Sequence, residues 1–359
     1  MAATRERGVA CDRGAAFALE AELAAETAAL PYAVGIAAVH VESGAAFRVR
    51  AHERYPLAST VKVAFLLELH RRAAEGALDP DARHRLRESD KCPGSGVLQD
   101  LDRGASVTWR DLGTLMMTVS DNTATEILWQ HLGPKAVNAT LRELGLWSFD
   151  LGCPFRAGFL LAYGLAAEWP LPIRDWLPDW QAATAAERAR RYTRIEREHA
   201  ETPWPVLLAA EEAAQAAAPG DPAEADQRAF DQALDNSATP EEMAALLAAI
   251  VRPAEGLDGP SAPVGRDGAR AMLVTMGRCQ YRDRIPRLLP PGTPVANKSG
   301  TVGGTVNDCA VVVLPDGTHL ALAILTRRIP PDVEDRDVED LEARLARRIH
   351  DAFSGREER

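Results

Sequence analysis

Ser59 and Lys62 lie three residues apart at the start of an apolar stretch that continues to Leu69. If this stretch is a helix, the two side chains share one face of its first turn. An uncompensated ammonium group in a protein interior is costly, so a buried lysine needs a partner or a use. A desolvated lysine has a lowered pKa and can take the proton of a serine hydroxyl, which makes the serine a nucleophile. The alternative is structural: Ser59 caps the helix and Lys62 extends to the surface.

Two further polar motifs follow in the chain. Ser-Asp-Asn occupies residues 120–122, between two predicted helices, and Lys-Ser-Gly-Thr occupies residues 298–301, on a predicted strand that two glycines follow. Taken alone, the first string is typical of a helix cap and the second of a turn. The order and the structural context of all three motifs together favour an active site.

The three motifs resemble the S-x-x-K, S-D-N and K-T-G signature of the penicillin-recognising serine hydrolase superfamily. The chain is most similar to the class A β-lactamase-like branch, roughly over residues 18–149 and 236–328, and the similarity includes the residues around the first two motifs (54–59 and 117–125). The resemblance implies a β-lactamase/transpeptidase-like fold of the α+β class. It also implies a serine hydrolase that acts on an amide, ester or lactam, with β-lactam hydrolysis or acylation among its activities, or a related acyltransferase.

The resemblance implies catalytic roles for the first two motifs. Ser59 would attack an acyl carbonyl, and Lys62 would accept its proton or hold the network that does. Ser120 would relay a proton to the leaving nitrogen or oxygen. Asn122 would orient Lys62 and donate a hydrogen bond to a substrate amide.

For the third motif, the resemblance implies a role in binding. Lys298 would keep the site electropositive and, with the Ser299 hydroxyl, would hold a substrate carboxylate. Gly300 would leave room for the substrate against the strand. The backbone N–H groups of Ser59 and Thr301 would form the oxyanion hole. Position 299 carries Ser where many relatives carry Thr, a change that keeps the hydroxyl.

One expected group is missing from the sequence pattern. Class A relatives use a loop glutamate to activate the deacylating water, but here no Glu followed by Asn four residues later precedes Asn236. Glu211, Glu212 and Glu224 lie in that interval, and nothing selects one of them. Glu126 lies one turn after the second motif, and we expect it to be a surface acid. Either the acyl-enzyme hydrolyses slowly, as in a penicillin-binding protein, or another group activates water or an amine acceptor.

The interval between the second and third motifs is longer than the resemblance implies. The extra length falls in residues 150–235, which carry four of the seven tryptophans of the chain: Trp169, Trp176, Trp180 and Trp204. Two interpretations stay open. The tryptophans form a lid or an acyl pocket, or they pack the helices of the insertion itself.

Hydrophobic patterning predicts strands near both ends of the chain and helices between them. This indicates one antiparallel sheet built from both termini, flanked by terminal helices, with an inserted all-α subdomain. Strands are predicted at residues 32–41, 45–51, 294–301, 309–314 and 319–326. Helices are predicted at residues 14–30, 59–76, 109–119, 123–132, 137–144, 185–200, 206–218, 237–251, 269–276 and 338–353.

These elements suggest a division of the chain. We predict an α/β part made of residues 14–55 and 265–353, and an all-α part at 56–264 that contains the Ser59 helix. Residues 150–235 are a helical insertion atypical of the family, and residues 1–13 and 354–359 are tails.

Composition narrows the function further. The net charge of −11 and the pI of about 5.3 argue against a nucleic-acid or anionic-membrane partner. The start of the chain shows no apolar signal region, no apolar run reaches the roughly 20 residues that span a bilayer, and the five cysteines are best explained as buried reduced thiols. We therefore expect a cytoplasmic protein and a small-molecule acyl substrate, from secondary metabolism for example.

Two rival classes remain. The eight histidines form no HxxxH or HxH pair, so a metal-dependent hydrolase has little support, and we expect no metal and no cofactor. A catalytically silent binding protein that uses the same cleft is the second rival. It would bind its ligand reversibly whether or not Ser59 is present.

Overall fold

A five-stranded antiparallel sheet forms the centre of the computed structural model, which describes residues 13–216, 221–233 and 236–355. The strand order is β2-β1-β10-β9-β8. The strands are β1 (Ala33–His40), β2 (Ala46–Val49), β8 (Val295–Val302), β9 (Thr305–Val313) and β10 (His319–Arg327). Because both ends of the chain contribute strands to one sheet, the predicted α+β fold class is confirmed.

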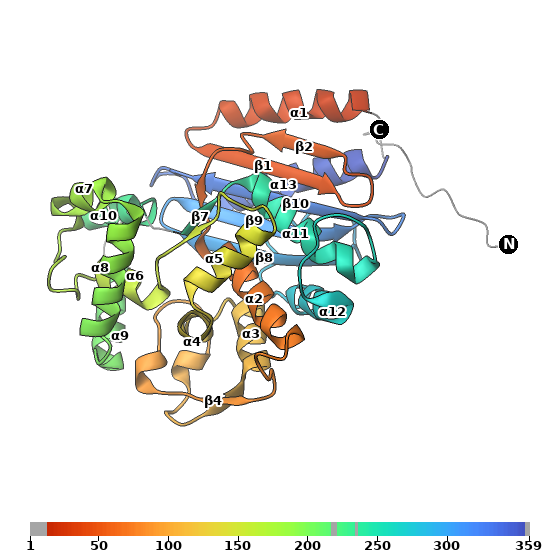
Figure 1. Ribbon diagram of the computed structural model, residues 1–359. Helices are drawn as coiled ribbons and strands as arrows, with labels where there is room; N and C mark the ends of the chain where they lie inside the picture. Colours follow the sequence, from red (N-terminus) through yellow and green to blue (C-terminus); the bar gives the residue numbers. More distant parts are fainter. Residues whose placement is uncertain (1–12, 217–220, 234–235, 356–359) are drawn as a thin grey trace.

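Helices cover both faces of this sheet (Figure 1). The two terminal helices, α1 (Arg13–Ala28) and α13 (Asp335–Phe353), pack together on one face. The other face is covered by α11 (Pro240–Glu255) and the helical body below it. Side chains of a strand alternate between faces, so Val34 and Ile36 of β1 join the core under the terminal helices while Ala37 joins the core under α11.

The helical body surrounds α2 (Lys62–Ala74), whose residues from Lys62 to Leu69 are all buried. A short 3-10 turn, η1 (Ala58–Val61), leads into α2. The helices around α2 are α3 (Trp109–Thr118), α4 (Asn122–Leu132), α5 (Pro134–Glu143) and α12 (Gly265–Met276). The order of helices and strands agrees with the prediction in all these elements.

Several boundaries differ from the prediction. The part predicted to be all-α also contains short strands, β3 (Tyr55–Pro56), β4 (Arg83–Arg85), β5 (Ser106–Thr108), β6 (Asp150–Leu151) and β7 (Asn236–Ala238), which are too short to show an alternating pattern. The strand predicted from Cys309 begins at Thr305, because Asn307 and Asp308 are polar but are buried in hydrogen bonds. The helix predicted from Ser237 begins at Pro240, after the Thr239 cap.

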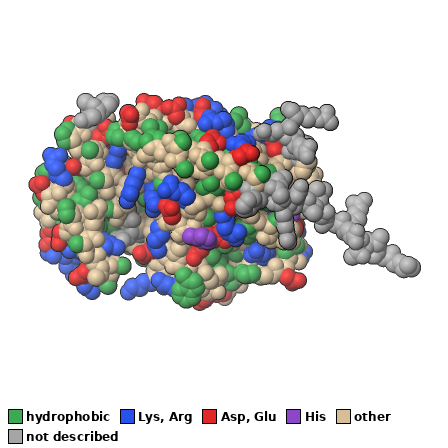
Figure 2. Space-filling view, turned by 90° about the horizontal axis from the view of Figure 1, so that it is seen from above, with side chains coloured by type: hydrophobic (Ala, Val, Ile, Leu, Met, Phe, Trp, Pro, Cys, Tyr) green, Lys and Arg blue, Asp and Glu red, His purple; other side chains and the backbone are tan. Residues whose placement is uncertain are grey.

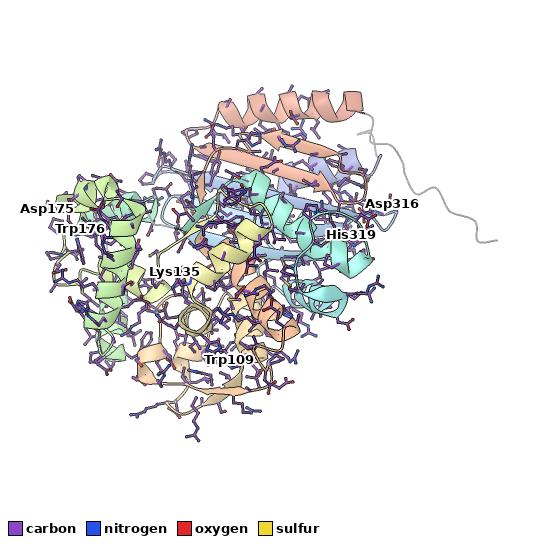
Figure 3. All side chains as sticks on the ribbon, in the orientation of Figure 1. Trp109, Lys135, Asp175, Trp176, Asp316 and His319 are labelled. Atoms are coloured by element: carbon purple, nitrogen blue, oxygen red, sulfur yellow. The ribbon has the colours of Figure 1, made fainter. Side chains whose placement is uncertain are left out.

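The inserted region at 150–235 forms a separate lobe of helices (Figure 1). These are α6 (Phe155–Ala162), α7 (Leu177–Ala182), α8 (Ala185–Glu198), α9 (Trp204–Gln215) and α10 (Pro222–Asp231). Trp180 is fully buried in the lobe, with edge contacts to Trp169 and Trp176 at ring distances of 5.4 and 5.9 Å. Figure 3 shows Trp176 within this lobe. The tryptophans therefore build the core of the insertion, as the second interpretation held.

Other expectations concern thiols, charge and the chain ends. Cys92, Cys279 and Cys309 are buried free thiols, and Cys153 is buried. Cys11 lies outside the described residues. So do residues 1–12 and 356–359 of the predicted tails and residues 217–218 of the helix predicted at 206–218. Lys and Arg side chains are interspersed with Asp and Glu on the face seen in Figure 2. Among the described helices, none is both long and apolar enough to cross a membrane.

Candidate active site

Lys62 is fully buried at the start of α2 and does not extend to the surface. Its Nζ lies 2.6 Å from the Ser120 carbonyl oxygen, 3.0 Å from Ser120 Oγ and 2.8 Å from Asn122 Oδ1. Burial, reinforced by the nearby Lys298 ammonium, lowers the pKa of Lys62 well below its ordinary value. A lowered pKa favours the neutral amine, which is the form that can accept a proton.

Ser59 lies inside the 3-10 turn that precedes α2, not at a capping position. The residue before it, Ala58, has a left-handed backbone with φ of +48°, which is costly for a residue with a side chain. Lys62 follows one turn later, so the two residues have the spacing that the sequence predicted. Ser59 remains partly accessible and lines a cleft.

The second motif combines a helix cap with site residues. Asp121 caps α4 by accepting a hydrogen bond from the Ala124 N–H at 2.8 Å. Ser120, with a left-handed φ of +57°, and Asn122 flank the cap, and both side chains lie at Lys62 Nζ. Asp121 therefore caps α4 as the capping interpretation held, and the fold brings Ser120 and Asn122 together with Lys62.

The loop before α3 is fastened to the second motif. Asp121 Oδ2 accepts hydrogen bonds from the backbone of Val97 and Leu98 at 2.7 and 2.8 Å. Asn122 Nδ2 donates to the Pro93 carbonyl at 2.8 Å, and Ser95 Oγ donates to the carbonyl of residue 120 at 2.7 Å. These bonds fix the wall of the cleft and the orientation of the Asn122 amide.

The third motif lies on the edge strand β8, next to the Ser59 turn. Lys298 is buried, and its Nζ lies 3.1 Å from Ser120 Oγ. Burial lowers the pKa of Lys298 to about 8. A Cβ atom on Gly300 would lie 2.7 Å from the Ser59 nitrogen, which is closer than real contacts allow. Glycine at position 300 therefore lets β8 pack directly on the backbone of the Ser59 turn.

Arg284 lies at the site although no sequence motif identifies it as a candidate. Its Nη1 donates to the carbonyl oxygens of Gly300 and Asn307 at 2.9 and 2.7 Å, and its Nη2 donates to Thr301 Oγ1 at 2.6 Å. It also lines the cleft. Its partners are distant in sequence and no motif surrounds it, so only the fold reveals it. Arg284 also forms an ion pair with Glu339 at 3.3 Å, so the positive charge in this part of the cleft comes mainly from Lys298.

The acids considered as deacylating bases lie elsewhere. Glu211 accepts a hydrogen bond from the Gly94 N–H at 2.9 Å, Glu224 pairs with Arg228 at 3.1 Å, and Glu212 is exposed. All three are absent from the residues that line the cleft. The interval thus supplies no glutamate at the described site.

The expectation that Glu126 is a surface acid is wrong. It is buried, because the inserted lobe covers its side of α4, and its carboxylate accepts hydrogen bonds from the Arg156 N–H at 3.0 Å and from Gln130 Nε2 at 2.9 Å. Burial raises the pKa of Glu126. Glu126 therefore fastens the start of α6 to α4.

The cleft has a volume of about 680 Å³ and unites the three motifs with the inserted lobe. One side carries the motif residues Ser59, Ser120, Asn122, Ser299, Gly300 and Thr301. The other side carries aromatic residues of α6 and α10 and of the segment after α6: Phe155, Phe159, Tyr163 and Phe230. The insertion thus contributes an aromatic wall to the cleft, but from other residues than its four tryptophans.

Comparison with known proteins agrees with this architecture. A family model described as "Beta-lactamase enzyme family" matches residues 18–353. Among curated proteins, β-lactamases PSE-4 and CARB-3 of Pseudomonas aeruginosa are each 28% identical over 128 residues, which is 35% of this chain and 44% of theirs. The chain thus spans less than half the length of the curated relatives it matches.

Solved structures share the fold over nearly the whole chain. A β-lactamase from Sphaerobacter thermophilus DSM 20745 superposes with a TM-score of 0.67 at 24% identity, covering 95% of this chain and 99% of that one. PBP-A superposes with a TM-score of 0.65 at 20% identity, covering 94% and 96%. At these identities the likeness is one of fold.

Proposed function

The chain belongs to the beta-lactamase enzyme family, and from this premise we propose that it is a serine hydrolase that acts on an amide, ester or lactam through an acyl-enzyme on Ser59. The observation that carries the proposal is the buried Lys62 Nζ, within hydrogen-bond distance of Ser120 Oγ and Asn122 Oδ1. A neutral buried amine one turn from a serine can take the hydroxyl proton.

In the proposed reaction, Ser59 Oγ bonds to the acyl carbon while its proton passes to Lys62 Nζ. The backbone N–H groups of Ser59 and Thr301 hold the negative oxygen of the tetrahedral intermediate. The bond to the leaving nitrogen or oxygen then breaks, and Ser120 Oγ gives its proton to the leaving group. Two lysine ammonium groups lie 3.0 and 3.1 Å from Ser120 Oγ and can return that proton.

We propose that the leaving-group side of the substrate carries a negative charge. Lys298 and Arg284 supply positive charge there, and the Ser299 hydroxyl lines the same part of the cleft. A carboxylate is the simplest group that such donors hold. We also propose a cytoplasmic location, which the finding of native protein in a periplasmic or secreted fraction would contradict.

The rate of deacylation distinguishes a hydrolase from the second candidate, an acyltransferase or transpeptidase-like enzyme. The second candidate is favoured by the position of Glu211, Glu212 and Glu224, which all lie outside the cleft lining. If none of these three glutamates activates water, the acyl group would persist on Ser59 until another acceptor arrived.

Intact-protein mass spectrometry over time, after mixing with a penicillin and a cephalosporin, tests the proposal. The expected result is an adduct that Ser59→Ala abolishes and that a matched change of a half-buried serine outside the cleft lining, Ser261→Ala, leaves intact. A persistent adduct supports slow deacylation, and a transient adduct with ring-opened drug supports β-lactam hydrolysis. If a general serine-reactive probe also fails to label Ser59, the protein is a binding protein and the proposal is wrong.

A further inference from the structure

The inserted lobe gives the cleft one acidic side chain, Asp231, in addition to its aromatic wall. Asp231 is the last residue of α10, where the lobe meets the end of the central sheet (Figure 1). It lines the cleft together with Phe230 of α10 and Phe159 and Tyr163 from α6 and its end. Asp231 is the acid that the inserted lobe contributes, and it lies next to three aromatic rings, whereas the other acids of the lining, Asp335 and Glu339, come from α13.

Hydrogen bonds to both oxygens fix the position of the Asp231 carboxylate. Oδ2 accepts a hydrogen bond from the Gly303 N–H at 2.8 Å, and Oδ1 accepts one from Gln227 Nε2 at 3.0 Å. A Cβ atom on Gly303 would lie 2.7 Å from Oδ2, so glycine there permits the close approach. A carboxylate offers about four acceptor positions, so this group has capacity for a further donor.

None of the charged or titratable groups that face Asp231 fully neutralises its carboxylate. Arg228 of α10 faces it but forms an ion pair with Glu224 at 3.1 Å, and Tyr163 faces it from the end of α6. Burial raises the pKa of Asp231 to about 7. A cationic ligand group would offset this desolvation cost.

Asp231 is hydrogen-bonded at the end of β8, several residues away from the place where the reacting bond would lie. Its partner Gly303 lies two residues after Thr301, which is about 7 Å along an extended chain, and five residues after Lys298, which is about 16 Å. Asp231 is therefore too far along the strand to act on a bond held at the Thr301 N–H. Asp231 thus lies at the end of the cleft away from Lys298, where the acyl group of a bound substrate would extend.

We propose that the acyl group of the substrate has an aromatic or apolar body that ends in a cationic amine, and that Asp231 binds this amine. The proposal rests on the proposed acyl-enzyme function of the same cleft. The aromatic side chains of the lobe receive the body, and the carboxylate receives the end. The substrate would thus be a zwitterion, with its negative group at Lys298 and Arg284.

Binding to Ser59→Ala protein tests the proposal without turnover. The probes are N-(phenylacetyl)glycine and its derivatives with a para aminomethyl, hydroxymethyl or carboxymethyl group, measured by calorimetry at pH 8. We expect the aminomethyl compound to bind about 10-fold tighter than the hydroxymethyl compound, and the carboxymethyl compound to bind weakest. This comparison needs no change at Asp231, so it holds even if a variant there fails to fold.

Variants assign the preference to its residue. In Ser59→Ala/Asp231→Asn protein the aminomethyl preference should fall to within about 2-fold, while Ser59→Ala/Asp335→Asn, which changes another acid in the cleft lining, should keep it. Equal affinities in the Ser59→Ala protein, or a preference that survives Asp231→Asn, would overturn the proposal.

Two further measurements separate this proposal from the function on which it rests. Labelling of unmutated protein by an uncharged fluorophosphonate probe reports the reactivity of Ser59 alone. If Ser59 is labelled but the aminomethyl compound binds no tighter than the others, the binding proposal is wrong and the acyl-enzyme proposal holds. If the aminomethyl compound binds tighter but Ser59 is not labelled, the acyl-enzyme proposal is wrong and the binding proposal holds. If Asp231→Asn instead traps a neutral acyl group on Ser59, Asp231 is the deacylating base and the binding proposal is wrong.

Discussion

The buried side chains of Lys62 and Lys298 both lie close to the hydroxyl group of Ser120. Lys62 Nζ and Lys298 Nζ lie 3.0 and 3.1 Å from Ser120 Oγ. Burial lowers the pKa of both groups, and the Lys298 charge lowers that of Lys62 further. The pKa of Lys62 falls well below its ordinary value, and that of Lys298 falls to about 8. In the proposed reaction Lys298 therefore serves as the cation and Lys62 as the base.

The first prediction concerns the pH dependence of acylation. Lys298 is charged below its pKa of about 8 and neutral above it, so the rate of Ser59 acylation by an anionic substrate should fall as pH rises through 8. Lys298→Arg keeps the charge at high pH, so the variant, although slower, should lose this decline. Acylation rates between pH 6 and 10 measure the effect.

A matched exposed lysine controls for general effects of the change. Lys135, labelled in Figure 3, is exposed at the start of α5, and Lys135→Arg should keep the decline above pH 8. If the unmutated protein shows a flat rate up to pH 10, Lys298 does not act as the substrate's cation.

At the scale of elements, the contact between β8 and the Ser59 turn sets the geometry of the oxyanion hole. Gly300→Ala would place a Cβ atom 2.7 Å from the Ser59 nitrogen and 2.9 Å from the Leu57 oxygen. Backbone atoms cannot rotate away, so the turn and the strand must separate. Since one misplaced oxyanion donor costs about 100-fold or more in rate, acylation should slow by at least that factor.

The acylation rate and the thermal midpoint together check this second prediction. Gly44→Ala, in the β1–β2 turn, has open space around its new Cβ but an unfavourable left-handed backbone, with φ of +73°. It should lower the midpoint and leave acylation unchanged. Normal acylation in Gly300→Ala would show that β8 does not fix the oxyanion donors.

A shared amide links the insertion to the helical body. Gln130 Nε2 of α4 donates to Glu126 at 2.9 Å and to Glu196 of α8 at 2.5 Å. Two carboxylates around one amide repel each other when both are ionised. Burial, with the nearby Glu126 charge, raises the pKa of Glu196 to about 7.

The third prediction follows from that pKa. Because the folded-state pKa of Glu196 exceeds its ordinary value of 4.5, the native state binds more protons than the unfolded chain between pH 4.5 and 7. Its contribution to the free energy of unfolding therefore falls as pH rises through that window. Glu196→Gln should stabilise the protein by on the order of 1 kcal/mol at pH 8 and have little effect at pH 4.

Denaturant unfolding at both pH values measures this difference. Glu198 lies on the same helix but is exposed and pairs with Arg194 at 3.0 Å. Glu198→Gln should give no stabilisation at pH 8. Equal effects of the two changes would mean that Glu196 is not held close to Glu126.

At the scale of the whole molecule, the described residues pack into three separate hydrophobic cores. Two lie on opposite faces of the sheet, and the third lies inside the inserted lobe around Trp180. Trp180 contacts Trp169, Trp176 and Tyr192. Because this core has few residues, it depends more than the other two on one large side chain.

The fourth prediction is that Trp180→Ala unfolds the lobe before the rest. Truncation of a buried tryptophan costs about 3–5 kcal/mol, so protease should cut within residues 155–231 while the sheet and the body stay intact. Limited proteolysis with mass mapping identifies the cuts. The exposed Trp147, at 70% relative accessibility, provides the control, because Trp147→Ala should leave the digestion pattern unchanged. Simultaneous cleavage in all three cores would contradict the prediction.

The fold class and the three motifs could be predicted from the sequence, because strands, helices and short signatures are local patterns. It did not reveal Arg284, whose partners Gly300, Thr301 and Asn307 are 16 to 23 residues away. It also misjudged Glu126, whose burial depends on a lobe that no local pattern places over α4. Tertiary packing decides both cases, so their signal lies in the fold.

The strand order has a consequence for synthesis of the chain. β10 lies between β1 and β9, so the first hairpin of the sheet, β1 and β2, pairs with a strand that ends at Arg327. During translation this hairpin cannot complete its pairing until the chain up to Arg327 has left the ribosome. Domains generally fold as units while exposed strand edges invite aggregation. The sheet is therefore completed only after β10 emerges, more than 250 residues after the nucleophile turn.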